Sequence, residues 1–429
     1  MKAYKSLTTL ELKTELEMLK KESDSYKEKK LALNMARGKP GVEQLELSRE
    51  LLDAIHSNSS LHDRKDNVDC GNYGELKGTT EAREFFGEYM GATKEQIIVI
   101  GSASLTFMYD CLSRALLKGV LGSEKPWIHQ EPKFLCPVPG YDRHFSICEF
   151  LGVEMIPIPM DENGPDMDMV EDLVSKDSSI KGMWCVPKYS NPTGISYSND
   201  VIKRLASLQP KAKDFRVFCD NAYAVHKIYE DIPTLNLLEE FKKAGNPDMI
   251  YLYGSTSKIT FPGAGVAIFA ASEDNIAFTE KQLSMQAISW DKINMLRHVR
   301  FLKSMEGIHA HMEKHAQILR PKFEVVNNAL ESELMKREVG AFIKPLGGYF
   351  VTYLAPHGCA KRIVNLCKEM GVVLTAAGAT HPYGNDPDDT YIRIAPSFPS
   401  EEELKQAMEV FCVAARIAVI EKHCSSRTK

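Results

Sequence analysis

Three ionisable side chains stand within or at the end of apolar segments of this sequence. Lys258 follows such a segment inside a turn rich in serine and threonine, Asp220 ends another, and Arg393 lies within a third. A desolvated lysine amine loses its proton easily and can form a Schiff base with a carbonyl compound. A carboxylate at the end of a strand points into the crevice where α/β sheets bind ligands. An arginine in an apolar strand needs an anionic partner. Lys258, Asp220 and Arg393 are therefore candidates for chemistry and ligand binding.

A fourth feature is the stretch Ser102-Ala103-Ser104, which follows the apolar segment Gln96 to Ile100 and opens a helix-like segment. Free backbone amides and the helix dipole make such a junction an anion site, to which serine hydroxyls add donors. The same serines could also serve as ordinary helix caps.

The elements that must position these residues alternate between strand-like and helix-like segments from Thr79 onward. The strand-like segments are continuous apolar runs, which is typical of strands covered on both faces. This rhythm predicts an α/β fold with a mostly parallel sheet flanked by helices, followed by a smaller α+β domain. We expect residues 1–45 to belong to the small domain, 46–300 to form the large domain, and 301–429 to complete the small one. Residues 290–328 are expected to form one long helix, with Pro321 a candidate kink.

The order of three motifs resembles a known family. Asn191-Pro192-Thr193-Gly194, Asp220-Asn221-Ala222-Tyr223 and the Ser/Thr-rich turn of Lys258 occur in the same sequence order as in the fold-type I aminotransferases. The resemblance implies the pyridoxal 5'-phosphate (PLP)-dependent transferase fold, with PLP held on Lys258 as a Schiff base. It also implies that the large domain binds the cofactor.

The resemblance assigns roles to further residues. Lys258, Asp220 and Tyr223 would be catalytic, with Asp220 beside the pyridine nitrogen. Tyr223 and Asn191 would bind the phenolic oxygen of the cofactor, and Tyr141 would stack on its ring unless it is a core tyrosine. The remaining cofactor contacts implied are Ser102, Ala103, Ser104, Ser255, Ser257 and, reaching across a dimer interface, Tyr73.

On the substrate side, the resemblance implies that Arg393 binds the α-carboxylate, with Asn191, Gly38 and Arg37 nearby. In dicarboxylate-specific relatives a cation of the partner subunit meets the side-chain carboxylate of the substrate. Lys292, Arg297 and Arg37 are candidates for this cation, although each is equally compatible with a surface charge. The role implied for Tyr73 predicts a homodimer with shared active sites.

The chain departs from the family pattern after the lysine. An arginine about eight residues on usually pairs with the phosphate, whereas the stretch Gly263-Ala264-Gly265-Val266-Ala267 contains none. This variant, together with Arg37-Gly38-Lys39-Pro40 and Gly140-Tyr141-Asp142-Arg143-His144-Phe145, is similar to a bacterial branch described as type Ic aspartate aminotransferases. The likeness extends from about Leu31 to Phe398.

The function implied is transamination of an L-amino acid, foremost L-aspartate, with 2-oxoglutarate by a ping-pong mechanism. The same residues would serve a PLP-dependent lyase or decarboxylase. A PLP-binding regulatory module is a third alternative, but the helix predicted for residues 8–30 is too small to be a DNA-binding domain.

Composition narrows the setting. Of the 429 residues 44% are apolar and 26% charged, and the net charge of −5 gives no reason to expect nucleic acid or an anionic membrane as a partner. The ten cysteines lack CxxC pairs, which argues against a metal site and favours thiols in a reducing compartment. Residues 1–30 lack the apolar core of a secretory signal, and no segment approaches 18 apolar residues. We therefore expect a cytoplasmic protein.

Overall fold

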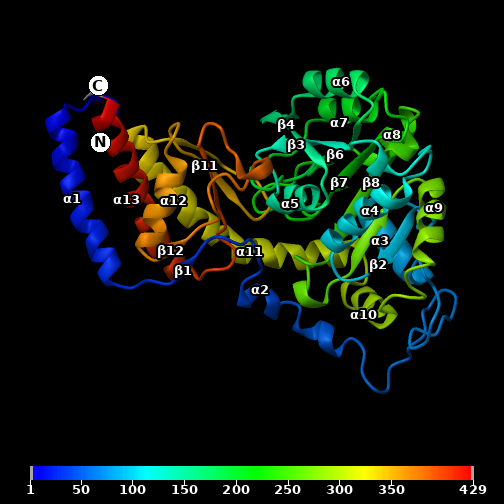
Figure 1. Ribbon diagram of the computed structural model, residues 1–429. Helices are drawn as coiled ribbons and strands as arrows, with labels where there is room; N and C mark the ends of the chain where they lie inside the picture. Colours follow the sequence, from blue (N-terminus) through cyan, green and yellow to red (C-terminus); the bar gives the residue numbers. More distant parts are fainter. Residues whose placement is uncertain (1–2, 427–429) are drawn as a thin grey trace.

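The computed structural model describes residues 3–426, which form two parts connected by helix α11 (Met305–Ala329) (Figure 1). The larger part is built on an eight-stranded sheet in the order β2-β9-β8-β7-β6-β3-β4-β5. Its strands are β2 (Ile97–Ile100), β3 (Lys133–Val138), β4 (Glu154–Asp161), β5 (Gly164–Pro165), β6 (Ile180–Cys185), β7 (Arg216–Asp220), β8 (Ile250–Ser255) and β9 (Ala267–Ala270).

Strand direction decides where ligands can bind. Neighbours β4, β3, β6, β7 and β8 pair in parallel, while β9 runs against both β8 and β2. The carboxyl ends of β2, β3, β6, β7 and β8 therefore lie at one edge of the sheet. In open α/β sheets this is the edge at which ligands bind.

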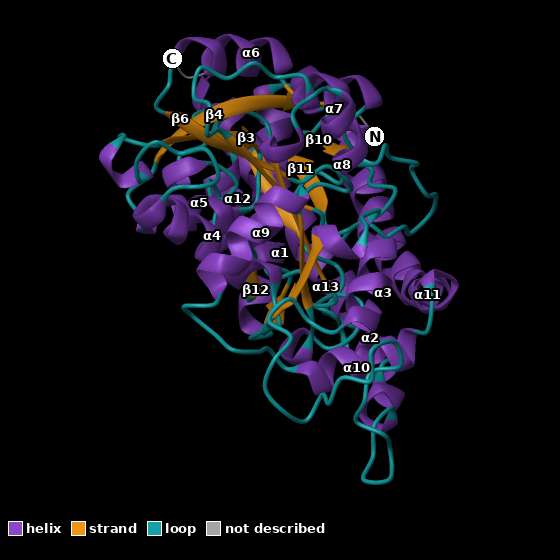
Figure 2. Cartoon of the chain, turned by 90° about the vertical axis from the view of Figure 1, so that its right-hand side faces the viewer, coloured by secondary structure: helices purple, strands orange, loops and turns teal. Residues whose placement is uncertain are grey.

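The apolar strand segments are continuous because both faces of the sheet are buried. Successive side chains of a strand point to opposite faces, so Val217 and Cys219 pack into one core while Phe218, between them, packs into the other. Helices cover the sheet on both sides (Figure 2). Those of the larger part are α3 (Thr80–Met90), α4 (Ser104–Lys118), α5 (Asp142–Phe150), α6 (Met167–Lys176), α7 (Asn199–Ala206), α8 (Leu237–Lys243), α9 (Glu273–Leu283) and α10 (Lys292–Leu302).

The smaller part combines both ends of the described chain. It contains an antiparallel sheet in the order β10-β11-β13 and the short parallel pair β1-β12. Helix α1, which begins after the capping box of Thr8 and Glu11, lies beside α13 (Figure 1). The elements are α1 (Thr9–Glu28), β1 (Leu33–Asn34), α2 (Val42–Glu46), β10 (Ala341–Ile343), β11 (Val351–Leu354), α12 (Ala360–Glu369), β12 (Val372–Val373), β13 (Tyr391–Ile394) and α13 (Glu401–Ser426).

The predicted α/β class, with a mostly parallel sheet flanked by helices and a smaller α+β part, is confirmed. The boundaries 1–45, 46–300 and 301–429 stay predictions, and residues 1–2 and 427–429 lie outside the described part of the chain. Helix α11 belongs to both parts, because Ile308 and Met312 pack into a core of the larger sheet and Phe323 into the core of the smaller part.

The single helix expected over residues 290–328 is wrong. It is divided into α10 and α11, and Lys303 between them has a left-handed backbone with φ of 67°. Ser304 then caps α11 by accepting a hydrogen bond from the Gly307 amide. Periodicity continues across the break, which is why the pattern alone did not reveal it.

The helices and the cysteines bear on the cellular compartment predicted from the sequence. Among residues 3–426, none of the helices has the length and apolar character required to cross a bilayer. Nine cysteines are buried, and these nine are thiols rather than disulfides.

A buried ion pair ties β6 to the loop before β7. The Lys181 amine lies 2.8 Å from the Asp214 carboxylate, which also accepts hydrogen bonds from Ser123 and Trp127. Burial alone would raise the pKa of Asp214, but the bonds from Lys181 and Ser123 outweigh it and lower the pKa. The pair therefore helps to fix the strand that carries Asp220.

We expect Lys181→Met to lower the free energy of unfolding by roughly 3–5 kcal/mol, because it leaves the Asp214 carboxylate buried without its cation. Lys133→Met is the matched control, since Lys133 pairs with Asp177 at the surface at 3.2 Å, and its loss should be below about 1 kcal/mol. Urea denaturation of both variants provides the comparison. Equal losses would contradict the importance of the buried pair.

Candidate active site

The residues predicted to do chemistry meet at the carboxyl edge of the larger sheet. Asp220 is the last residue of β7, and Lys258 follows β8, its neighbour in the sheet. Asn191 follows β6, and Tyr141 follows β3 and directly precedes α5. Parallel strands thus bring together side chains that lie more than a hundred residues apart in the sequence.

Asp220 is held by a histidine that stacks on a tryptophan. One carboxylate oxygen, Oδ2, lies 3.2 Å from His144 Nε2, and the His144 ring is parallel to the Trp184 ring at 4.4 Å. The other oxygen, Oδ1, is buried and has no hydrogen-bond partner among the described residues. A buried carboxylate oxygen without a donor is costly, so this atom marks a place where a ligand donor fits.

Lys258 has the environment of a reactive amine. Burial lowers its pKa, and the Asp220 carboxylate opposes this effect only in part. Its Nζ lies 5.0 Å from the centre of the Tyr223 ring. Burial also raises the pKa of Tyr223 well above its usual value, so this hydroxyl keeps its proton at neutral pH and can donate it in a hydrogen bond.

The backbone of Lys258 is also held. Its carbonyl oxygen lies 3.4 Å from His226 Nε2 and 3.5 Å from the Tyr349 hydroxyl. Burial and the charge of Lys258 lower the pKa of His226 to about 3, so the imidazole is neutral and donates through Nε2. The Gly347-Gly348-Tyr349 segment thereby contacts the turn that carries the amine.

The candidate anion site predicted from the sequence lies where β2 passes into α4. Ala103 is the N-cap of α4 and provides no side-chain hydrogen bond, so the first helix amides are left without a side-chain acceptor. Gly265 brings the Lys258 turn close to this helix start. A Cβ at Gly265 would lie 2.9 Å from the Ser102 carbonyl oxygen and 3.4 Å from the Ser257 amide nitrogen. The Ser255 and Ser257 hydroxyls are 3.2 Å apart beside it.

The position at which the family has its arginine faces the wrong way for a phosphate contact. The residue eight places after Lys258 is Val266, which is 1% exposed and packs into a core of the larger sheet. Its amide donates to the Thr256 hydroxyl at 2.9 Å. At the position of the family's arginine the chain therefore places an apolar side chain that is packed in the core.

Arg393 reaches the site from β13 of the smaller part. Its Nη1 is 2.9 Å from Asp142 Oδ1 and 3.2 Å from Asn191 Oδ1, and Nη2 donates to the Thr375 hydroxyl at 3.0 Å. The guanidinium stacks on the Phe350 ring at 4.8 Å. Gly38 packs against the same ring, where a Cβ would lie 2.4 Å from its nearest carbon.

Four further predicted residues are exposed or contact other groups of the chain, and their predicted roles stay predictions. Tyr73 is 78% exposed, and Arg37 is exposed at the surface. The amine of Lys292 donates to the carbonyls of Asn72 and Gly74, and thus holds the loop of Tyr73. Arg297 donates to Asn294 at 2.6 Å.

Sequence reasoning missed His144, Asp142 and Thr375 as site residues. His144 and Asp142 belong to the segment that supported the resemblance, and their position just after the end of β3 was the available signal. Thr375 follows β12, but nothing in its local sequence distinguishes it from other threonines at strand ends.

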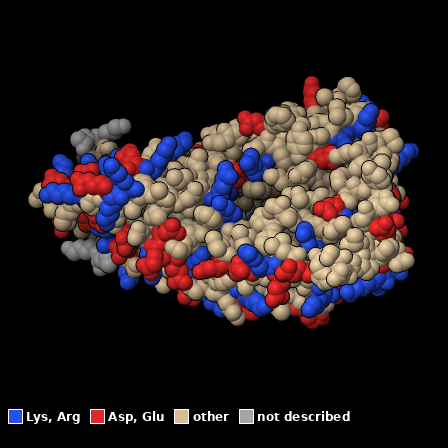
Figure 3. Space-filling model, turned by 90° about the horizontal axis from the view of Figure 1, so that it is seen from below, with Lys and Arg blue, Asp and Glu red and all other residues tan. Residues whose placement is uncertain are grey.

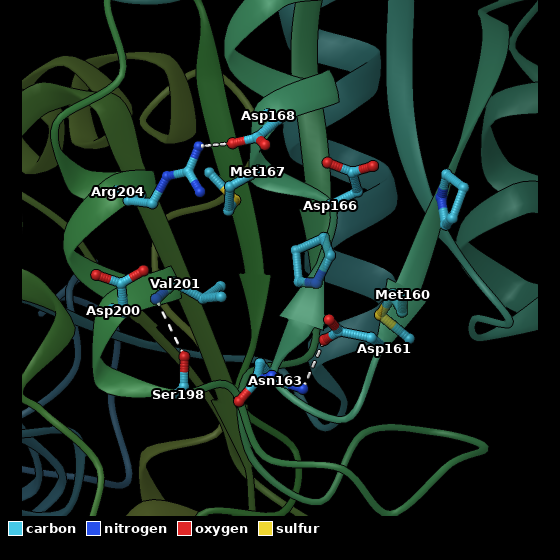
Figure 4. Close-up of a pocket in the computed structure, with 12 residues that line it drawn as sticks. Met160, Asp161, Asn163, Asp166, Met167, Asp168, Ser198, Asp200, Val201 and Arg204 are labelled. Carbon is cyan, nitrogen blue, oxygen red and sulfur yellow. Dashed lines mark hydrogen bonds and ion pairs between the residues drawn. The ribbon is translucent and has the colours of Figure 1, made fainter.

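Lys and Arg side chains gather beside a hollow between the two parts of the molecule (Figure 3). A separate hollow of about 560 Å³ lies between β4, α6 and α7 (Figure 4). Two of its carboxylates are engaged locally, since Arg204 pairs with Asp168 and the Asn163 amide donates to Asp161. None of the predicted site residues lines it.

Comparison with known proteins identifies the class. The model of the aspartate amino-transferase family matches residues 7–427. An aspartate aminotransferase of Corynebacterium glutamicum is 41% identical over 95% of this chain and 94% of its own length. A crystal structure of an aspartate transaminase from that organism superposes with a TM-score of 0.94 at 40% identity and covers 97% of this chain and 98% of its own.

The chain therefore belongs to the aspartate aminotransferase family and is an enzyme of the aminotransferase type. The resemblance drawn from the motifs is confirmed. The α-aminoadipate aminotransferase LysN of Thermus thermophilus, complexed with N-(5'-phosphopyridoxyl)-L-leucine, has the same fold with a TM-score of 0.69 at 20% identity, covering 92% of this chain and 93% of its own.

The orientation of position 266 yields a testable consequence. Val266→Arg should lower the free energy of unfolding by more than about 3 kcal/mol, because the new charge enters the core. Gly263→Arg is the control, as Gly263 is exposed with open space around it. Thermal unfolding and soluble yield distinguish the two. A stable Val266→Arg protein would show that this position can turn toward the candidate anion site.

Proposed function

We propose that this enzyme transfers the amino group of L-aspartate to 2-oxoglutarate by a ping-pong mechanism, with PLP bound to Lys258. When bound, PLP supplies the carbonyl that condenses with amines and a ring that takes up electrons from Cα. Family membership and the name of the C. glutamicum relative support the reaction and the donor.

One observation carries the proposal: a buried carboxylate with one unpaired oxygen lies beside a buried lysine of lowered pKa. Asp220 Oδ1 is suited to accept a hydrogen bond from a protonated pyridine nitrogen. The uncapped start of α4 and the close approach at Gly265 suit a phosphate. The residues present therefore fit PLP.

The side chains then divide the work. The Lys258 amine, whose pKa burial lowers, takes the proton from Cα of the amino donor and returns it. Asp220, oriented by His144, keeps the pyridine nitrogen protonated. Tyr223 and Asn191 contribute donors for the phenolic oxygen. Arg393 binds the α-carboxylate of the substrate.

The same proposal includes the assembly and the location. We propose a homodimer in which Tyr73 contacts the cofactor phosphate of the partner subunit, which its exposure and the anchoring of its loop by Lys292 support. The nine buried thiols support a reducing, cytoplasmic setting.

Covalent trapping tests the cofactor assignment. Sodium borohydride should fix PLP on the peptide that contains Lys258, because reduction makes a Schiff-base linkage permanent. Lys258→Ala should retain no covalent cofactor, whereas the surface variant Lys133→Met should trap as the wild type does. Mass spectrometry of peptides provides the readout. Colourless wild-type protein without a modified peptide would refute the assignment.

Steady-state kinetics test the substrate assignment. L-aspartate and 2-oxoglutarate should yield oxaloacetate and glutamate, and Arg393→Ala should lower kcat/KM for the donor by roughly a hundredfold, as expected from the loss of a charged hydrogen-bond pair. Arg204→Ala, which removes a surface arginine, is the control. Consumption of another donor without oxaloacetate formation from aspartate would refute the donor and leave the enzyme class intact.

A further inference from the structure

Arg393 is paired with a carboxylate of its own chain. The guanidinium is 7% exposed, and its Nη1 lies 2.9 Å from Oδ1 of Asp142, the first residue of α5. A buried arginine without a counter-charge would be strongly destabilising. Asp142 supplies this counter-charge from the larger part of the molecule, whereas Arg393 belongs to the smaller part.

The pairing leaves a donor unused. Asp142 contacts Nη1 only, which it shares with Asn191, while Nη2 donates to Thr375. Nε is buried and has no hydrogen-bond partner among the described residues. A guanidinium can present two parallel N–H groups to one carboxylate, an arrangement stronger than a single contact. Asp142 meets only one nitrogen of the fork that Nη1 and Nη2 form, so a second carboxylate that takes both of these nitrogens would bind better than Asp142 does.

We propose that Asp142 competes with the substrate α-carboxylate for Arg393, so that the substrate binds by exchanging one carboxylate for another. The inference rests on the proposed function, in which Arg393 binds that carboxylate. Asp142 is then a specificity-determining residue. Every ligand of Arg393 must break the ion pair between Asp142 and Arg393, and the free energy of that pair weakens the binding of the ligand. Only a ligand with an ionised carboxylate replaces the negative charge that Arg393 loses when Asp142 moves away.

The surroundings of Asp142 permit its release. Its side chain is 31% exposed, so rotation toward solvent needs no rearrangement of the core. It lies in the first turn of α5, where the helix dipole favours a negative charge. Arg393, by contrast, stays fixed between Phe350, Asn191 and Thr375. The exchange thus moves one short side chain and preserves the charge balance of the site.

Succinate, a dicarboxylate without an amino group, is a probe that binds without reacting. Calorimetric titration of the cofactor-loaded enzyme should give a Kd roughly tenfold lower for Asp142→Asn than for the wild type, since the variant keeps the shape and loses the competing charge. Asp142→Glu, which keeps the charge, should bind as the wild type does. Asp200→Asn is the matched control, because Asp200 lies in the first turn of α7 beside the hollow of Figure 4.

In kinetics, Asp142→Asn should lower the KM for the amino donor by a similar factor and change kcat less. An unchanged or higher Kd for Asp142→Asn would overturn the proposal and show that Asp142 only orients Arg393. Equal tightening by Asp142→Glu would also overturn it, because charge would not be the cause. If Asp142→Asn does not fold, Asp142→Ser removes the same charge. Failure of the proposed function is distinguishable: the wild type would then trap no PLP and transfer no amino group.

Discussion

The carboxylate of Asp220 at the end of β7 is the group on which the rest of the site depends. A buried carboxylate needs hydrogen-bond donors for both of its oxygens. Among the described residues only Oδ2 has one, from His144, and Oδ1 has none. The stacking of His144 on Trp184, the parallel order of β6, β7 and β8, and the turn that carries Lys258 all serve to hold this carboxylate and an amine at one edge. A rigid, half-satisfied charge is a preorganised binding group.

The second constraint is that a buried cation comes from a different sheet. Arg393 stands on β13, opposite Thr352 of β11, and reaches Asn191, which follows β6 of the larger sheet. Helix α11 packs into the cores of both parts and so fixes their relation. The ion pair between Asp142 and Arg393 also connects the two parts, and Gly38 packs on the Phe350 ring beside it.

Much of this could be predicted from the sequence, because local patterns carry the information. Continuous apolar runs predicted the two-faced sheet, and the residues that end them predicted the edge at which Asp220 and Lys258 meet. The break at Lys303 was not predictable from periodicity, because α10 and α11 are both amphipathic and only the backbone at one residue differs. The partner of Arg393 also escaped prediction, since the pairing of Asp142 with a residue 251 positions away is a tertiary contact.

The valine at position 266 and the aspartate at position 142 both show how this chain treats buried positive charge. At position 266 the chain places a valine in the core, so in the proposed site the phosphate would depend on the amides at the start of α4 and on nearby hydroxyls. At Arg393 the chain provides a full charge and also its counter-charge. Because an unpaired buried cation destabilises the fold, a fixed arginine needs a carboxylate at all times. A carboxylate that can rotate away lets the same arginine serve both the stability of the protein and the recognition of a ligand.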